Sequence, residues 1–221
     1  MNLITAHKNE RRERILAATK KIVSERGYDG LTMRDLAEDA RVSVQTLYNL
    51  FGTKDEILMA GLHHLAAALN DVRSSPGASF FQRGVTCFEA GMRLIGQDQE
   101  YYRAVVLRLF TSKEAGAMRR QIEAAFCALI EWYLADAKSV GQLAEWADPR
   151  IVALHALALQ SSAMLTWSMG FFDFFMFRGA AYSGLCHVLA GVARGPFLVE
   201  VEARMRDLAK SDVVEKYIKG S

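Results

Sequence analysis

The stretch from Arg41 to Lys54 contains no Asp or Glu, whereas a solvated helix commonly mixes Glu with Lys. Between its two terminal cations it offers hydroxyls, amides, a phenol and a methyl-bearing side chain. These groups are supplied by Ser43, Val44, Gln45, Thr46, Tyr48 and Asn49. A surface that meets phosphates should exclude carboxylates, and uncharged donors and acceptors suit the edges of bases. The chemistry that this pattern indicates is recognition of DNA.

Two short helices joined by a tight turn would position these side chains. Thr32 and Ser43 are N-cap candidates, because a hydroxyl can accept hydrogen bonds from the free N–H groups of a first turn. The first helix is predicted after Thr32 and the second over Val44–Phe51, with Arg41-Val42 as the turn. The predicted inward faces are Met33, Leu36, Ala37 and Ala40, then Leu47, Leu50 and Phe51. This is a helix-turn-helix arrangement; the alternative is a helical hairpin within a larger bundle.

The surroundings resemble the TetR family of bacterial transcriptional repressors over Arg14–Ala60. The residues that carry the resemblance are Gly27, Thr32, Asp35-Leu36-Ala37, Val42-Ser43, Thr46-Leu47-Tyr48, Phe51, Lys54 and Leu58. Several residues at fixed spacing make a more specific signal than one short motif. The resemblance covers roughly the first quarter of the chain; the rest agrees in length and helical character.

The predicted contacts with DNA divide into base-reading residues and phosphate anchors. Arg34 matches a position that can reach a base edge in similar proteins. The groups suited to base edges or nearby phosphates are Gln45, Thr46 and Asn49, and Val44 suits a thymine methyl. The predicted phosphate anchors are Thr32, Ser43, Tyr48 and Lys54.

Composition predicts an all-α chain. It has 221 residues, of which 51% are hydrophobic and only 3 are Pro, and no run of alternating β-branched residues is present. Net charge is only +2, but seven basic and three acidic residues lie in Met1–Arg26. Local positive charge beside a helix-turn-helix suits phosphate contact. Residues before about Asn9 are expected to form a disordered leader.

We predict a three-helix DNA-binding domain at 1–60 and a larger helical ligand-binding and dimerisation domain at 61–221. Thr53 and Glu56 form a capping box that starts a helix running to about Arg73. The clearest break is Ser74–Gly77. The other helices are expected at Asn9–Arg26, Phe80–Gly96, Tyr101–Phe110, Glu114–Ala137, Ala180–Arg194 and Phe197–Lys219.

The segment Ile151–Phe172 contains no Lys, Arg, Asp or Glu. About 20 apolar residues can span a bilayer, but His155, Gln160 and several hydroxyls interrupt this segment and no basic cluster flanks it. We therefore expect no membrane partner. In proteins similar to this one the last two long helices of the second domain form the homodimer interface, which would cover this segment and Ala180–Arg194.

The second domain is rich in aromatic residues and Met. One interpretation is core plus dimer interface; the other is a pocket for an apolar or aromatic small molecule between helices. The resemblance supports a pocket, since relatives are mostly ligand-released repressors. The candidate lining residues are Phe88, Met92, Phe110, Phe126, Met164 and Trp167.

No catalytic constellation, cofactor motif or metal-ligand spacing is present in the sequence, so an enzyme is the weakest class. The 3 Cys are scattered and indicate reduced thiols of a cytoplasmic protein. The predicted function is a homodimeric, sequence-specific regulator that binds double-stranded operator DNA. The resemblance makes it a repressor released by a hydrophobic small molecule. The alternative is a ligand-independent helical regulator or scaffold that acts through protein–protein contacts.

Overall fold

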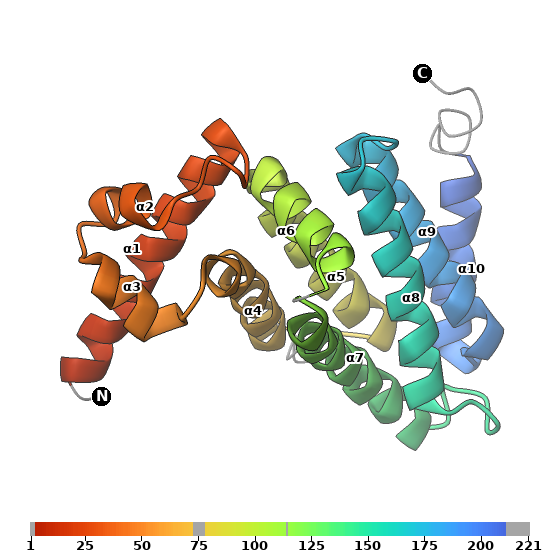
Figure 1. Ribbon diagram of the computed structural model, residues 1–221. Helices are drawn as coiled ribbons and strands as arrows, with labels where there is room; N and C mark the ends of the chain where they lie inside the picture. The colour runs from red at the N-terminus through yellow and green to blue at the C-terminus, as the bar shows by residue number, and fades with distance from the viewer. Residues whose placement is uncertain (1–2, 73–77, 114, 211–221) are drawn as a thin grey trace.

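The computed structural model describes residues 3–72, 78–113 and 115–210, and this part of the chain folds into ten helices (Figure 1). The prediction of an all-α fold is therefore confirmed. The helices are α1 Leu3–Arg26, α2 Met33–Asp39, α3 Val44–Phe51, α4 Lys54–Val72, α5 Phe80–Gln97, α6 Gln99–Thr111, α7 Gly116–Ser139, α8 Pro149–Ser168, α9 Phe174–Val192 and α10 Gly195–Ala209.

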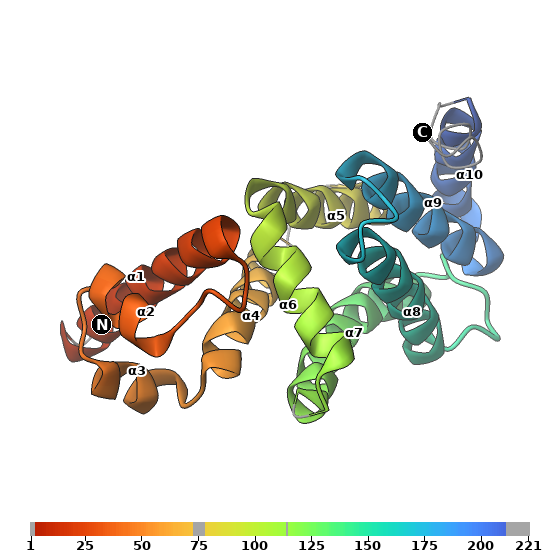
Figure 2. The same cartoon turned by 45° about the horizontal axis from the view of Figure 1, so that its top comes forward.

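Helices α1–α3 form a small unit at one end of the molecule, and α4 runs from this unit into the larger bundle (Figures 1 and 2). In the bundle α8 packs against α7 and α9, and α10 packs against α9. Helix α6 contacts α1 and α8, so it lies between the small unit and the far end of the bundle. The molecule is elongated, with α1–α3 and α10 at opposite ends.

One hydrophobic core runs from the small unit into the bundle. Ile15 of α1, Leu36 of α2 and Leu47 of α3 are fully buried, and the same cluster continues through Leu58 of α4 to Trp167 of α8. A second cluster fills the space among α5 and α7–α10. Because the core is continuous and close-packed, a shift of α4 or α6 would also displace side chains in the unit that carries α3.

A close approach of α4 and α6 depends on one glycine. Tyr101 of α6 is fully buried and donates its hydroxyl to the carbonyl of Leu58 on α4. A Cβ on Gly61 would lie 2.2 Å from that hydroxyl oxygen. Burial raises the pKa of Tyr101, so the phenol stays neutral. Any larger residue at position 61 would have to push the two helices apart.

Several helix boundaries differ from the sequence prediction. Helix α1 begins at Leu3, so the expected disordered leader is helical from there, and no Gly or Pro precedes Asn9 to stop it. Helix α9 begins at Phe174, not Ala180, because the Asp173 carboxylate accepts from the Met176 N–H at 2.7 Å and caps it. The predicted break at Ser74–Gly77 and the end of the last helix beyond residue 210 fall largely or wholly outside the described residues.

The predicted boundary at residue 60 falls inside α4, which is continuous through that position. The division into two domains stays a prediction. Within the described residues, α8 alone is long and apolar enough to cross a membrane, and about a third of its apolar stretch is buried inside the protein. Helix α8 packs against α6, α7 and α9.

Candidate DNA-binding surface and ligand cavity

The turn between α2 and α3 is built by local hydrogen bonds. The Thr32 hydroxyl accepts from the Asp35 N–H at 3.1 Å, and the Ser43 hydroxyl accepts from the Thr46 N–H at 3.1 Å. Both predicted N-caps are therefore formed. Arg41 adopts a left-handed backbone conformation with φ 54°, which reverses the chain within the turn and lets α3 leave α2 at an angle.

The inner face of α3 is anchored on α1. Leu47 is fully buried, while Leu50 and Phe51 are half-buried. The Arg12 guanidinium donates to the Leu50 carbonyl at 3.3 Å and lies 4.6 Å from the centre of the Phe51 ring. These contacts fix the rotation of α3 about its axis and thereby decide which side chains face outward.

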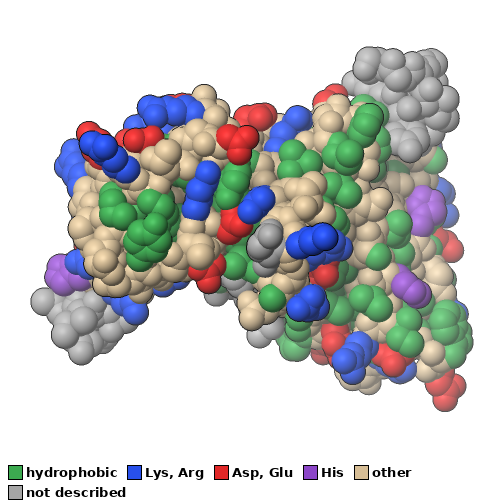
Figure 3. Space-filling view, viewed as in Figure 1, with side chains coloured by type: hydrophobic (Ala, Val, Ile, Leu, Met, Phe, Trp, Pro, Cys, Tyr) green, Lys and Arg blue, Asp and Glu red, His purple; other side chains and the backbone are tan. Residues whose placement is uncertain are grey.

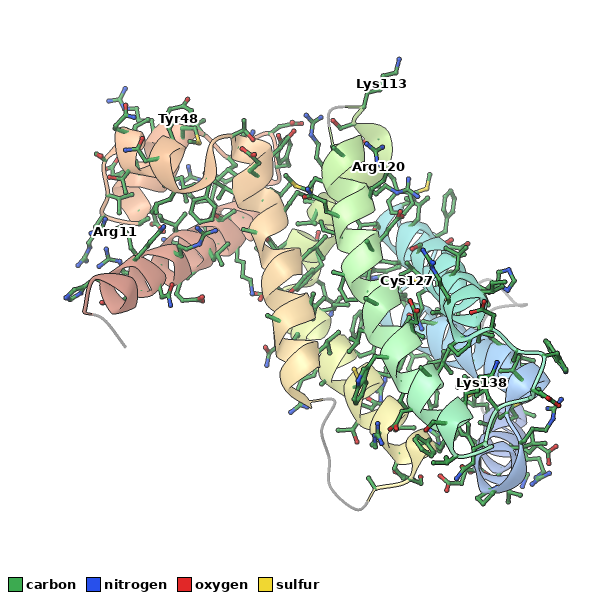
Figure 4. All side chains as sticks on the ribbon, turned by 90° about the horizontal axis from the view of Figure 1, so that it is seen from below. Arg11, Tyr48, Lys113, Arg120, Cys127 and Lys138 are labelled. Carbon is green, nitrogen blue, oxygen red and sulfur yellow. The ribbon has the colours of Figure 1, made fainter. Side chains whose placement is uncertain are left out.

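The outer face of α3 carries the residues that the sequence singled out. Tyr48 is 50% exposed and Val44 is 37% exposed; Figure 4 shows Tyr48 at the outer edge of the small unit. Gln45 and Asn49 are exposed and hydrogen-bond to each other at 2.9 Å. In the space-filling view a hydrophobic patch surrounded by uncharged atoms lies over the α2–α3 region, with cations near its margins (Figure 3).

The two predicted cations beside α3 differ in their surroundings. Arg34, in the first turn of α2, is exposed. Lys54 is half-buried, and its ammonium lies 3.9 Å from the centre of the Tyr28 ring. Burial lowers the pKa of Lys54, while Asp29 and Asp55 oppose that shift. Lys54 therefore lies at the first turn of α4 in a fixed position, whereas Arg34 is presented to solvent.

A polar cluster that the sequence analysis missed lies behind Lys54. The Tyr28 hydroxyl donates to Asp55, and Arg108 of α6 pairs with the same carboxylate at 2.8 Å. Burial and the hydrogen bond to Asp55 raise the pKa of Tyr28 to about 12. At the opposite end of α6, Lys20 of α1 pairs with Asp98, just before the helix, at 2.7 Å. These pairs fasten the small unit to α6, and their separation in sequence leaves no local pattern to reveal them.

A cavity of about 240 Å³ lies within the bundle, and helices α4–α9 line it. Five of the six candidate ligand residues line this cavity: Phe88, Met92, Phe110, Phe126 and Met164. The sixth, Trp167, lies outside the lining; it is fully buried and stacks on Phe177 with ring centres 5.0 Å apart. Arg83 and Arg119 also line the cavity, and no sequence pattern marks either of them as a lining residue.

The outer face of α8 exposes large apolar side chains. Ile151, Leu154 and Leu159 are between 45% and 57% exposed. The neighbouring surface of α9 is made of small or polar residues such as Ser183, His187 and Gly191. The cavity-lining residues Ala156 and Gln160 belong to the other side of α8, so the helix has one face toward the cavity and one toward solvent.

The family model of "Bacterial regulatory proteins, tetR family" matches residues 15–60. The repressor KstR of Mycobacterium tuberculosis is 40% identical over 77 residues, which is 34% of this chain and 35% of KstR. The regulator HbdR of an Aromatoleum species is 41% identical over 56 residues, 25% of this chain and 24% of HbdR. The chain thus matches between about a quarter and a third of the length of these curated relatives.

Solved structures extend the similarity to the whole fold. The TetR-family repressor FadR of Thermus thermophilus, crystallised in complex with lauroyl-CoA, matches with a TM-score of 0.65 at 21% identity, over 84% of this chain and 97% of that one. At this identity the likeness concerns the fold alone. Residues 15–60 of the chain thus match the DNA-binding segment of the TetR family of bacterial regulatory proteins, and the chain as a whole shares its helical fold with the FadR structure.

Proposed function

We propose that this protein is a homodimeric, sequence-specific DNA-binding transcriptional repressor that a small apolar molecule releases from its operator. The observation that carries the proposal is the outer face of α3, which is exposed, free of carboxylates and held in a capped helix-turn-helix. Such a face suits the major groove, where uncharged side chains meet base edges. DNA as the target also implies action in the cytoplasm.

The roles on DNA follow from exposure and chemistry. Gln45 and Asn49 exchange their mutual hydrogen bond for bonds to base edges, and Arg34 reaches an edge from α2. Val44 meets a thymine methyl, and Thr46 contacts a base or a neighbouring phosphate. The phosphate anchors are Thr32, Ser43, Tyr48 and Lys54. Lys54 also has the positive end of α4 beside it, which favours an anion.

Dimerisation would cover the apolar outer face of α8. Leu154 is 57% exposed and Ile151 is 54% exposed, which is unusual for large aliphatic side chains that lie close together on one helix. Pairing α8 and α9 with their symmetry copies makes a four-helix interface. Leu154→Glu should give a monomer in sedimentation velocity, while Glu145→Gln in the nearby loop should leave a dimer. A monomeric wild-type protein would contradict this part of the proposal.

The effector would occupy the cavity. Phe88, Met92, Phe110, Phe126 and Met164 give it a pliable apolar wall. Its volume lies just below the range of about 300–1,000 Å³ typical of small-molecule sites. The complex of the FadR neighbour with lauroyl-CoA supports an apolar ligand for a bundle of this fold.

Helix α6 is the physical link between effector and operator. It contributes Phe110 to the cavity wall and Arg108 to the pair with Asp55 at the start of α4. A ligand that displaces Phe110 would move α6, loosen Asp55 and tilt α4, which changes the separation of the two α3 helices in the dimer. By linkage, operator binding must weaken effector binding by the same factor.

The experiment is a mobility shift on the DNA upstream of the protein's own gene, with excess nonspecific competitor. A specific shift that Tyr48→Ala abolishes and Lys138→Ala preserves is the expected result, since Lys138 lies at the far end of α7 (Figure 4). If no specific sequence is recovered even from a random pool, the protein-binding scaffold replaces this proposal.

A further inference from the structure

The cavity that the proposed function assigns to an effector is not purely apolar. Among its described lining residues, the charged side chains are Arg83, Arg119 and Glu123. Charged groups on the wall of an apolar cavity are costly unless they are paired. How each of the three is paired therefore indicates what kind of ligand the cavity takes.

Arg119 and Glu123 satisfy each other. They lie one turn apart on α7, the Arg119 Nε donates to Glu123 at 2.8 Å, and both side chains are about a third exposed. The Arg119 guanidinium also lies 3.9 Å from the centre of the Phe110 ring. This pair is neutral overall and partly solvated, so neither side chain needs a charged ligand group as a partner.

Arg83 is different because one of its donors is buried and unused. Its side chain is only 16% exposed; one terminal nitrogen donates to Asp136 at 2.9 Å. Its Nε–H is shielded from solvent and has no acceptor among the described residues. Asp136 is 42% exposed and is not part of the cavity wall, so it neutralises Arg83 from the solvent side and leaves the Nε–H without a partner.

Aromatic rings hold the Arg83 guanidinium in place. It lies 5.2 Å from the centre of the Phe80 ring, 5.4 Å from Trp132 and 6.0 Å from Tyr133. The Tyr133 hydroxyl is already used, because it donates to the Phe80 carbonyl. A guanidinium fixed among rings is preorganised to accept an anion or a carbonyl oxygen at its free edge.

We propose that the effector is an anionic amphiphile, a mostly apolar molecule with one carboxylate-like group, and that Arg83 binds the anionic end. This inference rests on the proposed function, since it presumes that the cavity is the effector site. A ligand oxygen would accept the buried Nε–H, which has no other acceptor among the described residues. The apolar body would lie along the wall of aromatic residues and Met.

The position of Arg83 also orients the ligand. Arg83 lies against Trp132 and Asp136 in the second half of α7, whereas Arg119 and Phe110 lie at its beginning. From Arg119 to Trp132 the helix rises about 20 Å. With its head at Arg83, the ligand therefore directs its apolar end toward Phe110, on the helix that carries Arg108.

Two fluorescent probes with the same body test this assignment. Anilinonaphthalene sulfonate carries an anion, and N-phenyl-1-naphthylamine is its uncharged counterpart. For Arg83→Met we expect the affinity for the sulfonate to fall at least tenfold and the affinity for the amine to change less than twofold. Arg83→Lys should give an intermediate loss, because it keeps the charge but not the planar fork. Arg93→Met, an exposed change on the same helix, should leave both affinities unchanged.

Further controls keep the outcomes separate. Met164→Trp, which fills the cavity, should abolish binding of both probes, and thermal unfolding checks that each variant is folded. Equal losses of both probes in Arg83→Met, or no loss of either, would overturn the assignment while leaving a ligand cavity in place. If the wild-type protein bound neither probe, the effector part of the proposed function would fail together with it.

Discussion

Arg108 of α6 holds Asp55 of α4 through both carboxylate oxygens: its Nε lies 3.1 Å from each oxygen, and a terminal nitrogen lies 2.8 Å from one of them. Tyr28, in the turn after α1, donates its hydroxyl to the same carboxylate. One acid therefore ties together the small unit, the start of α4 and the end of α6. Phe110, two residues after Arg108 on α6, lines the cavity.

Disrupting the Arg108–Asp55 pair should lower the free energy of unfolding more than disrupting an exposed ion pair. In a double-mutant cycle of Asp55→Asn and Arg108→Met, read by urea unfolding, we expect a coupling energy of about 0.5–3 kcal/mol. The exposed pair Lys21–Asp39, at 2.7 Å, is the matched control and should couple by less than about 1 kcal/mol. Equal coupling in the two cycles would mean that Arg108 and Asp55 form an ordinary surface contact.

The contribution of Asp55 to the free energy of unfolding should depend on pH. Burial opposes its ionisation, but the Arg108 guanidinium and the Tyr28 hydroxyl outweigh burial and lower the pKa of Asp55. The unfolded chain therefore binds the proton more readily, so the stabilisation is complete above an ordinary Asp pKa of about 3.9 and is lost as pH falls through the lower folded value. The stability difference between wild type and Asp55→Asn should shrink in acid. A difference that stays constant down to about pH 2 would contradict this linkage.

Substitutions of the phosphate anchors and of the base-reading residues should have different effects on DNA binding: the first should change affinity for all sequences, and the second should change the preferred bases. Lys54→Met should weaken binding to all sequences and flatten the slope of log K against log salt by about 0.9. Tyr48→Phe should weaken all sequences with little change in slope, because it removes a neutral donor. Arg34→Ala or Gln45→Ala should instead change the preferred bases. Lys113→Met, at the α6–α7 connection (Figure 4), should behave as wild type; unchanged operator affinity in the Tyr48 and Lys54 variants would refute their anchoring role.

Gly61 should be intolerant of even a methyl group. A Cβ there would lie 2.2 Å from the Tyr101 hydroxyl oxygen and 2.7 Å from a ring carbon, so Gly61→Ala should destabilise the protein by about 1–3 kcal/mol through overpacking. Adding Tyr101→Phe should restore only part of the loss, since the ring carbon still clashes. Gly116→Ala, which meets nothing closer than 3.9 Å, is the control. Equal thermal unfolding midpoints for both alanine variants would show that α4 and α6 separate without cost.

Local signals explain which parts of the fold were predictable. The caps Thr32, Ser43 and Thr53 lie within three residues of the groups they satisfy, so the helix-turn-helix and the bounds of α3 follow from short-range chemistry. The start of α9 differs from the sequence prediction because its first turn, Phe174–Phe177, is apolar without a period, so that only the Asp173 cap marks where the helix begins.

The connections between units were not predictable in the same way. Asp55 and Arg108 are 53 residues apart, and Lys20 and Asp98 are 78 apart. Nothing local distinguishes these side chains from solvated charges. The same holds for Arg83, whose surroundings combine the Phe80 ring of α5, the Trp132 and Tyr133 rings of α7, and Asp136 about one turn further along α7. Helix periodicity was enough to predict most of the aromatic and Met residues that line the cavity. Periodicity alone could not distinguish Trp167, which stacks on Phe177, from residues that face the cavity.

Whether α3 reads a specific operator can be measured by selecting bound duplexes from a random DNA pool with wild type and with Gln45→Ala. We expect wild type to enrich a near-palindromic site with half-sites about 34–36 Å apart, or a multiple of that distance. We expect the variant to enrich a site with altered bases within the half-sites. No enrichment by wild type, or one unchanged sequence for both proteins, would contradict the proposal that α3 reads the operator.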